Sequence, residues 1–75
     1  MTLEQLKVGQ SCKVTHITAQ GMLKRKLLEM GITPGTQITL RRVAPLGDPI
    51  QINIRGFELS IRKSDAKNIA VELIN

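Results

Sequence analysis

The sequence predicts a mainly β protein: a small curled barrel of about five strands, with one α-helix inserted after the first strand. Three short segments, 37–43, 50–54 and 57–61, alternate apolar and polar residues with the period of two that half-buried strands show. One segment, 21–30, instead has apolar residues at helical spacing. A chain of 75 residues suffices for one domain and not for two, so we assign a single domain to residues 1–75.

The N-terminal part predicts a short helical turn followed by the first strand. Thr2 and Gln5 have the spacing of a capping box, in which a side chain in the first helical turn reaches back to the cap. Residues 10–17 are expected to form a strand, but Ile17 is out of register with the apolar positions before it. We therefore expect a β-bulge near His16.

The segment 21–30 is the one convincing helix. Leu23, Leu27 and Met30 fall at positions i, i+4 and i+7, which places them on a single face that packs against the core. Gly31 follows at the position where a helix commonly ends on a residue with positive φ. The sequence therefore predicts where this helix ends as well as which face it buries.

Two clusters of Pro and Gly set the turns on either side of the second strand. Before it, Pro34 and Gly35 match a type II turn, in which Pro takes the first central position and Gly the second. After it, a tight loop is predicted from four residues: Pro45, Gly47, Asp48 and Pro49. Together with Gly31, these positions are interpreted as structural turns.

The last third of the chain predicts a hairpin, a helical turn and a closing strand. The two-residue connection Arg55-Gly56 joins the third strand to the fourth. Ser64 is placed to cap one helical turn, and residues 69–74 form the closing strand. Closing the sheet into a barrel would remove the exposed edges of its Ile-rich strands. The apolar positions of the fourth strand are expected on one face: Phe57, Leu59 and Ile61.

Composition and charge exclude several classes of binding protein. Phe57 is the only aromatic residue, so the chain lacks the stacking platforms of single-strand nucleic-acid binders and the aromatic groove that captures proline-rich peptides. The net charge is +5, which favours an acidic partner or an anionic membrane face, or else belongs to a solvated surface. We expect no specific nucleic-acid partner.

The chain has too few reactive side chains for catalysis or for a metal centre. Cys12 and His16 lie four residues apart, and on one strand they would be about 13 Å apart, which is too far to share an ion. No glycine-framed nucleophile, paired carboxylates or phosphate-binding loop is present in the sequence. We therefore predict that the protein is not an enzyme and holds no cofactor and no metal of its own.

The N-terminus has no basic region followed by an apolar run, so it does not resemble a signal peptide. No apolar stretch approaches the roughly 20 residues that a membrane-spanning helix requires. A single cysteine fits a reducing compartment. These features predict a cytoplasmic protein.

Three sequence runs together resemble the FeoA family, the small cytosolic proteins of the bacterial ferrous iron transport system. They are KLLEMGITPGTQI, RVAPLGDPIQI and LSIRKSDAKNIAV, and the similarity extends over 3–73. The resemblance implies an SH3-like β-barrel with the helix inserted after the first strand, in agreement with the pattern of strands. The positions that match the family's motifs are Leu27, Gly31, Pro34, Gly35, Ala44, Pro45, Gly47, Asp48, Pro49, Leu59, Arg62 and Asp65.

The resemblance also implies a function. It indicates a non-catalytic accessory or regulatory protein that contacts a FeoB-type transporter, through either its cytosolic G-protein domain or its membrane part. Such a protein would be peripheral at the membrane through this partner. The alternative is a metal-responsive or regulatory SH3-like domain of the kind found in iron-dependent repressors.

Four helix residues are the candidates for partner binding. Leu28 and Met22 lie about 100° to either side of the buried stripe and are not needed for it. Lys24 and Arg25 belong to the one basic cluster of the chain and spread over the exposed side of the helix. We predict that these four side chains form the docking face.

Overall fold

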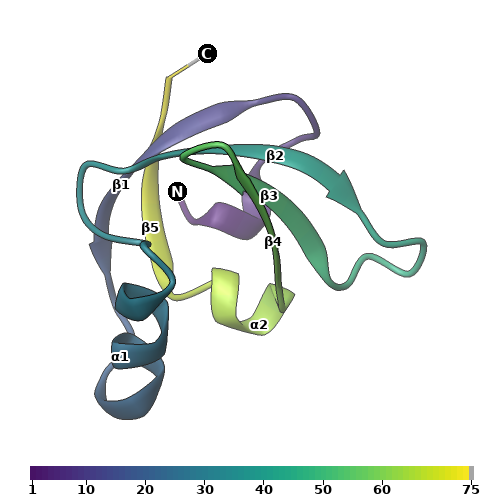
Figure 1. Cartoon of the computed structure of the whole chain (residues 1–75). Helices are drawn as coiled ribbons and strands as arrows, with labels where there is room; N and C mark the ends of the chain where they lie inside the picture. Colours follow the sequence, from purple (N-terminus) through teal and green to yellow (C-terminus); the bar gives the residue numbers. More distant parts are fainter. Residues whose placement is uncertain (75) are drawn as a thin grey trace.

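The structure is a computed structural model that describes residues 1–74. It confirms the predicted mainly β class and the predicted order of elements (Figure 1). The elements along the chain are the 3-10 helix η1 (Leu3–Gln5), β1 (Ser11–Ile17), α1 (Gly21–Glu29), β2 (Gln37–Val43), β3 (Ile50–Ile54), β4 (Phe57–Ile61), α2 (Lys63–Ala66) and β5 (Ile69–Leu73).

The five strands form one antiparallel sheet in the order β4-β3-β2-β1-β5. Figure 1 shows this sheet curled around η1, with α1 extending to one side and the β2–β3 loop to another. Within the described residues β4 and β5 are not paired, so the expectation that closure removes both edges is wrong. The N-terminal segment pairs with β5 instead: Thr2 bridges Ala70, and the Val71 N–H donates to the Met1 carbonyl at 2.8 Å.

Two bulges interrupt the strand pairing. The register shift between Val14 and His16 confirms the bulge predicted from the position of Ile17. A second shift, between Leu40 and Arg42, was not predicted from the regular alternation of β2. This second bulge ends the alternation, because Arg42 pairs with Gln51 and is exposed instead of lying on the buried face of Leu40.

One aliphatic core lies inside the curled sheet. Leu27 is fully buried, whereas Leu23 and Met30 are partly buried and pack against the same core, so the predicted helix stripe is confirmed. The largest side chains with no exposed surface come from η1, α1, the segment after it and three strands: Leu3, Leu27, Ile32, Ile38, Ile52 and Ile69. Helix α1 is therefore attached to the sheet mainly through Leu27.

The end of α1 and the turn after it have the predicted geometry. Gly31 has a φ of 90°, and the N–H of Ile32 donates to the Leu27 carbonyl at 3.1 Å, which is the long hydrogen bond of a Schellman motif. The N–H of Thr36 donates to the Thr33 carbonyl at 3.0 Å and closes the type II turn on Pro34 and Gly35. These two turns orient the exposed face of α1 relative to the sheet.

The helical turn α2 is not capped as predicted. Its N-cap residue is Arg62, and Ser64 lies inside the turn. The N–H of Lys63 donates instead to a carboxylate oxygen of Asp48, at 2.9 Å, from the distant β2–β3 loop. Asp48 therefore does more than shape its own loop, because it joins that loop to α2.

We expect replacement of Asp48 by alanine to lower the free energy of unfolding by about 1 kcal/mol, the usual cost of losing a side-chain cap. Asp48→Asn keeps an acceptor oxygen and should lose less. Urea unfolding of both variants, with exposed Glu72→Ala as the control, measures this difference. Equal losses in all three variants would contradict a capping role for Asp48.

The β3–β4 hairpin is confirmed, but its first apolar side chain is not in the core. Arg55 and Gly56, with φ values of 51° and 85°, form its two-residue turn. Ile61 is buried and Leu59 partly buried, whereas Phe57 is 71% exposed, contrary to the alternating pattern. Phe57 starts the edge strand β4 next to the hairpin tip, where the sheet extends beyond the core.

Candidate functional site

The exposed face of α1 brings together three of the four predicted docking residues. Lys24, Arg25 and Leu28 line a shallow depression of about 380 Å³ with Gly21 and Glu29. The spacing explains this grouping, because residues 21, 24, 25 and 28 stand at i, i+3, i+4 and i+7, on one side of the helix that is centred about 110° around the axis from Leu27. The fourth residue, Met22, is 86% exposed and lies about 60° around the helix from Arg25.

The depression has an apolar floor and a basic rim. Leu28 is 38% exposed, and the space next to Gly21 is open, because an added Cβ there would meet no atom within 4 Å. Among residues 1–74, Lys24 and Arg25 form no ion pair. Apolar surface surrounded by unpaired cations can accept an apolar side chain together with acidic neighbours.

A second concave site, which the sequence did not predict, lies over β2 and β3. It has a volume of about 600 Å³ and is lined by polar side chains of both strands, with Pro34 and Gly35 in its wall. Asn53 on β3 pairs with Thr39 on β2, and this register brings the polar positions of the two strands side by side. One residue in the sequence could have pointed to this site. Arg55 is at the first position of the two-residue β3–β4 turn, where Asn or Gly is usual, so an arginine there is unexpected.

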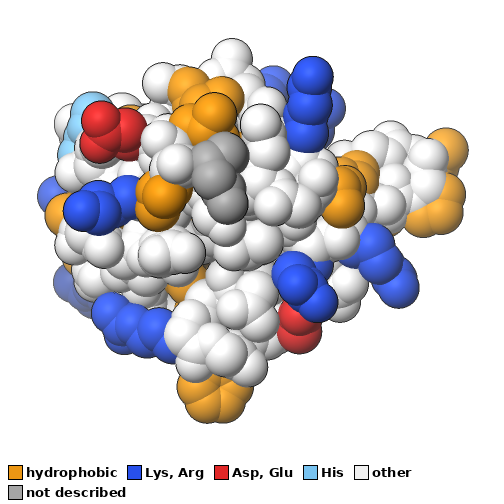
Figure 2. Space-filling model, turned by 90° about the horizontal axis from the view of Figure 1, so that it is seen from above, with side chains coloured by type: hydrophobic (Ala, Val, Ile, Leu, Met, Phe, Trp, Pro, Cys, Tyr) orange, Lys and Arg blue, Asp and Glu red, His pale blue; other side chains and the backbone are white. Residues whose placement is uncertain are grey.

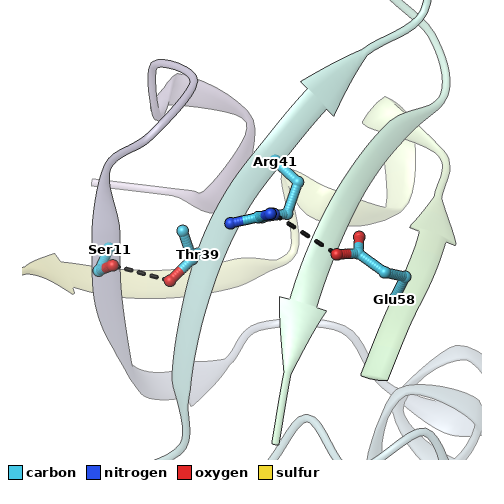
Figure 3. Close-up of polar contacts among 4 residues, drawn as sticks. All are labelled: Ser11, Thr39, Arg41 and Glu58. Atoms are coloured by element: carbon cyan, nitrogen blue, oxygen red, sulfur yellow. Dashed lines mark hydrogen bonds and ion pairs between the residues drawn. The ribbon is translucent and has the colours of Figure 1, made fainter. Parts of the chain in front are cut away.

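The polar side chains continue across the outer face of the sheet (Figure 3). The hydroxyl oxygens of Ser11 and Thr39 lie 2.7 Å apart, which joins β1 to β2. Arg41 Nε lies 3.4 Å from Glu58 Oε1, and both side chains are about half exposed, so this ion pair adds little stability. Figure 2 shows that Lys and Arg cover far more of the visible face than Asp and Glu do.

Exposed apolar side chains are otherwise dispersed. Figure 2 shows them in separate patches, one of them at the tip of the lobe that corresponds to the β2–β3 loop of Figure 1. Leu46 in that loop is 98% exposed. The β2–β3 loop, which carries Leu46, extends to a different side of the sheet from α1 (Figure 1). A substitution at Leu46 can therefore serve as the control for a substitution on the exposed face of α1.

Cys12 and His16 have separate environments. The bulge between them leaves Cys12 fully buried and His16 exposed, instead of on one face of the strand. Burial raises the pKa of the Cys12 thiol to about 11, with a smaller opposite effect from a hydrogen bond with the Ile38 backbone. Within residues 1–74 there is no group of three or more His, Cys, Asp or Glu side chains placed to hold a metal ion.

No helix in residues 1–74 combines the length and the apolar character needed to cross a membrane. The curled antiparallel sheet, the inserted helix and the single aliphatic core define an SH3-like domain.

Comparison with known proteins identifies the family. The chain matches the FeoA domain over residues 1–73, and it therefore belongs to the FeoA family, which is linked to ferrous iron transport. It is 36% identical over 75 residues to the Fe(2+) transport protein A/Fe(2+) transporter FeoB fusion protein of Porphyromonas gingivalis, of whose length it covers 9%. The predicted resemblance is confirmed.

Two solved structures show the same fold. The FeoA-like protein from Clostridium acetobutylicum is 40% identical with a TM-score of 0.94, covering 100% of this chain and 87% of that one. Stenotrophomonas maltophilia FeoA, which was crystallised with zinc and described as a prokaryotic SH3 domain protein, is 26% identical with a TM-score of 0.84. That alignment covers 96% of this chain and 89% of the other.

Proposed function

We propose that this protein is a non-catalytic accessory protein of ferrous iron uptake that acts through direct contact with a FeoB-type transporter. The observation that carries the proposal is the fusion protein, in which a domain similar to this whole chain is covalently joined to the transporter FeoB. Fusion raises the effective concentration of one part at the other, which is useful when the two parts act together. The protein would then work in the cytoplasm, at the membrane periphery.

The α1 face is the surface that we assign to this contact. Its partly exposed Leu28 lies between Lys24 and Arg25, which gives a small apolar centre with a charged rim. Protein interfaces commonly have this arrangement, with most of the binding energy at the centre. The rim cations would select an acidic surface on the transporter and accelerate association at low salt.

A pull-down with the cytosolic part of the transporter from the same organism tests the proposal, performed with and without a GTP analogue at physiological salt. Binding only in one nucleotide state would identify a regulator that reads the G-protein domain. Binding in both states would identify a constitutive accessory subunit. If neither the cytosolic part nor the full-length transporter is retained, the proposal is wrong.

We expect Leu28→Glu to weaken this binding by about tenfold or more, because a charge would replace the apolar centre of the depression. The fold should remain, since Leu28 is outside the core cluster. Leu46→Glu introduces the same charge at an exposed position on the β2–β3 loop and should bind like the unmodified protein. Titration calorimetry with both variants gives the comparison, and a folded Leu28→Glu variant with unchanged affinity would remove α1 from the interface.

A further inference from the structure

The pocket over β2 and β3 is built from two pairs of polar side chains. Gln37 and Thr39 on β2, and Asn53 and Arg55 at the end of β3, all line it. Thr39 and Asn53 are directly paired. Because the strands are antiparallel, Gln37, two residues before Thr39, and Arg55, two residues after Asn53, lie at the same end, so the four side chains share one face. Amide, hydroxyl and guanidinium groups from two neighbouring strands therefore lie next to one another on this surface.

Several donors in this pocket are unused. Arg55 Nη2 donates to the Thr36 hydroxyl at 3.5 Å, which is a long contact and occupies only one of the five guanidinium N–H groups. The side-chain amides of Gln37 and Asn53 make no hydrogen bond to any residue between 1 and 74. The pocket therefore presents at least three side chains that can donate to a ligand.

The backbone of Arg55 is unusual. Its φ of 51° lies in the left-handed region, and it is the only described residue other than glycine with a positive φ. This conformation is costly for an ordinary L-residue, and Asn, Asp or Gly is the usual choice in a two-residue hairpin turn. Arginine is therefore an unfavourable choice for this turn on backbone grounds, and a binding role of its side chain would account for its presence there.

The charge of the pocket limits the ligand. Arg55 is the only charged residue in the lining, and no acidic side chain of residues 1–74 forms an ion pair with it. A guanidinium group matches the two oxygens of one carboxylate, and neutral amides can donate to the remaining lone pairs. A single unpaired cation balances a single negative charge better than it balances a dianion.

We propose that this pocket binds a carboxylate group, with Arg55 as the bidentate donor and Gln37 and Asn53 as neutral donors beside it. The carboxylate comes either from a free small organic acid or from an acidic side chain of a protein partner. The inference does not rest on the proposed function, because the pocket and the α1 depression have no lining residue in common.

The test is a nuclear magnetic resonance titration of the ¹⁵N-labelled protein. One arm adds acetate, which carries a single negative charge, and the other adds a capped pentapeptide with a central aspartate, each against potassium chloride of equal ionic strength. We expect saturable shifts of the amide signals of Thr39, Asn53, Gly56 and of the Arg55 side chain in at least one arm. Saturation by acetate alone identifies a small acid as the ligand, whereas saturation by the peptide, and not by its asparagine analogue, identifies a protein side chain.

Three variants separate a binding role from a structural role of Arg55. Arg55→Asn suits the positive φ and keeps the hairpin, but it should weaken binding by at least about tenfold through loss of the charged donor. Arg55→Lys keeps the charge without the planar fork and should bind with intermediate affinity. Arg42→Asn removes an exposed arginine from the same strand pair and should bind normally. The proposal is overturned by shifts equal to those with chloride, by saturation with inorganic phosphate but with neither carboxylate, or by unchanged affinity of Arg55→Asn.

Discussion

Replacement of Leu27 by alanine is expected to lower the free energy of unfolding by about 3 kcal/mol, within the range for large-to-small changes in a packed core. Leu27 has no exposed surface and is the only fully buried side chain of α1. Its carbonyl also accepts the hydrogen bond from Ile32 that ends the helix. A domain of this size has a total stability of roughly 4–11 kcal/mol, so the loss is a large part of the whole.

Urea unfolding at neutral pH measures this loss, and Lys26→Ala is the matched control. Lys26 is the neighbouring exposed residue of α1, and its change to alanine keeps helix propensity high while leaving the core intact. The control should stay within about 0.5 kcal/mol of the unmodified protein. A Leu27→Ala loss below 1 kcal/mol would show that α1 is attached to the sheet by other contacts.

The same variant links stability to the proposed contact with the transporter. Loosening α1 would disorder the depression formed by Lys24, Arg25 and Leu28, so binding should weaken although none of these side chains is changed. Leu28→Glu should show the reverse pattern, with weak binding and a nearly unchanged unfolding midpoint. Comparing the Leu27→Ala and Leu28→Glu variants therefore distinguishes the role of α1 packing in stability from the role of its exposed face in binding.

The parts of the fold that local chemistry decides could be predicted from the sequence. Gly31 ends α1 because it tolerates the positive φ that the Schellman motif requires, and Pro34-Gly35 can form few turns other than type II. The register shift in β1 was also predictable, because Ile17 broke the alternation of its strand. In each case the residue that carries the signal lies within a few positions of the structure it determines.

The features that were missed depend on residues far apart in the chain. Asp48 caps α2 from the distant β2–β3 loop, and no residue close to Lys63 in the sequence indicates this contact. Phe57 is exposed because of its place at the start of an edge strand, which alternation alone does not reveal. The free side of β5 pairs with the N-terminal segment through Thr2 and Ala70, a contact between residues at opposite ends of the chain.

The same distinction applies to the two surfaces. The α1 depression could be anticipated, because helix periodicity alone places Lys24, Arg25 and Leu28 on the face opposite the core. The polar pocket could not, since Thr39 and Asn53 become neighbours only once the register of β2 against β3 is known. Strand pairing fixes that register through many contacts of the buried isoleucines, which no single sequence motif contains.

Cys12 makes the stability of the protein depend on pH in the alkaline range. Burial in the core raises the thiol pKa from an ordinary value near 9 to about 11, because the thiolate would lose its hydration there. Between these two values the folded state retains a proton that the unfolded state has released, so raising the pH favours unfolding. We expect the contribution to be fully present below pH 9 and to be lost by roughly 2–3 kcal/mol as the pH rises through 11.

Urea midpoints measured from pH 8 to pH 11 on the unmodified protein and on Cys12→Ala test this dependence. The alanine variant starts from a lower stability, because it removes a buried sulfur, but its curve should lack the thiol-dependent part of the slope. All other ionisable side chains are the same in the two proteins, so the difference between the two curves isolates Cys12. Parallel curves would show that water reaches the thiol in the folded state, and alkylation of Cys12 at neutral pH would then proceed without unfolding.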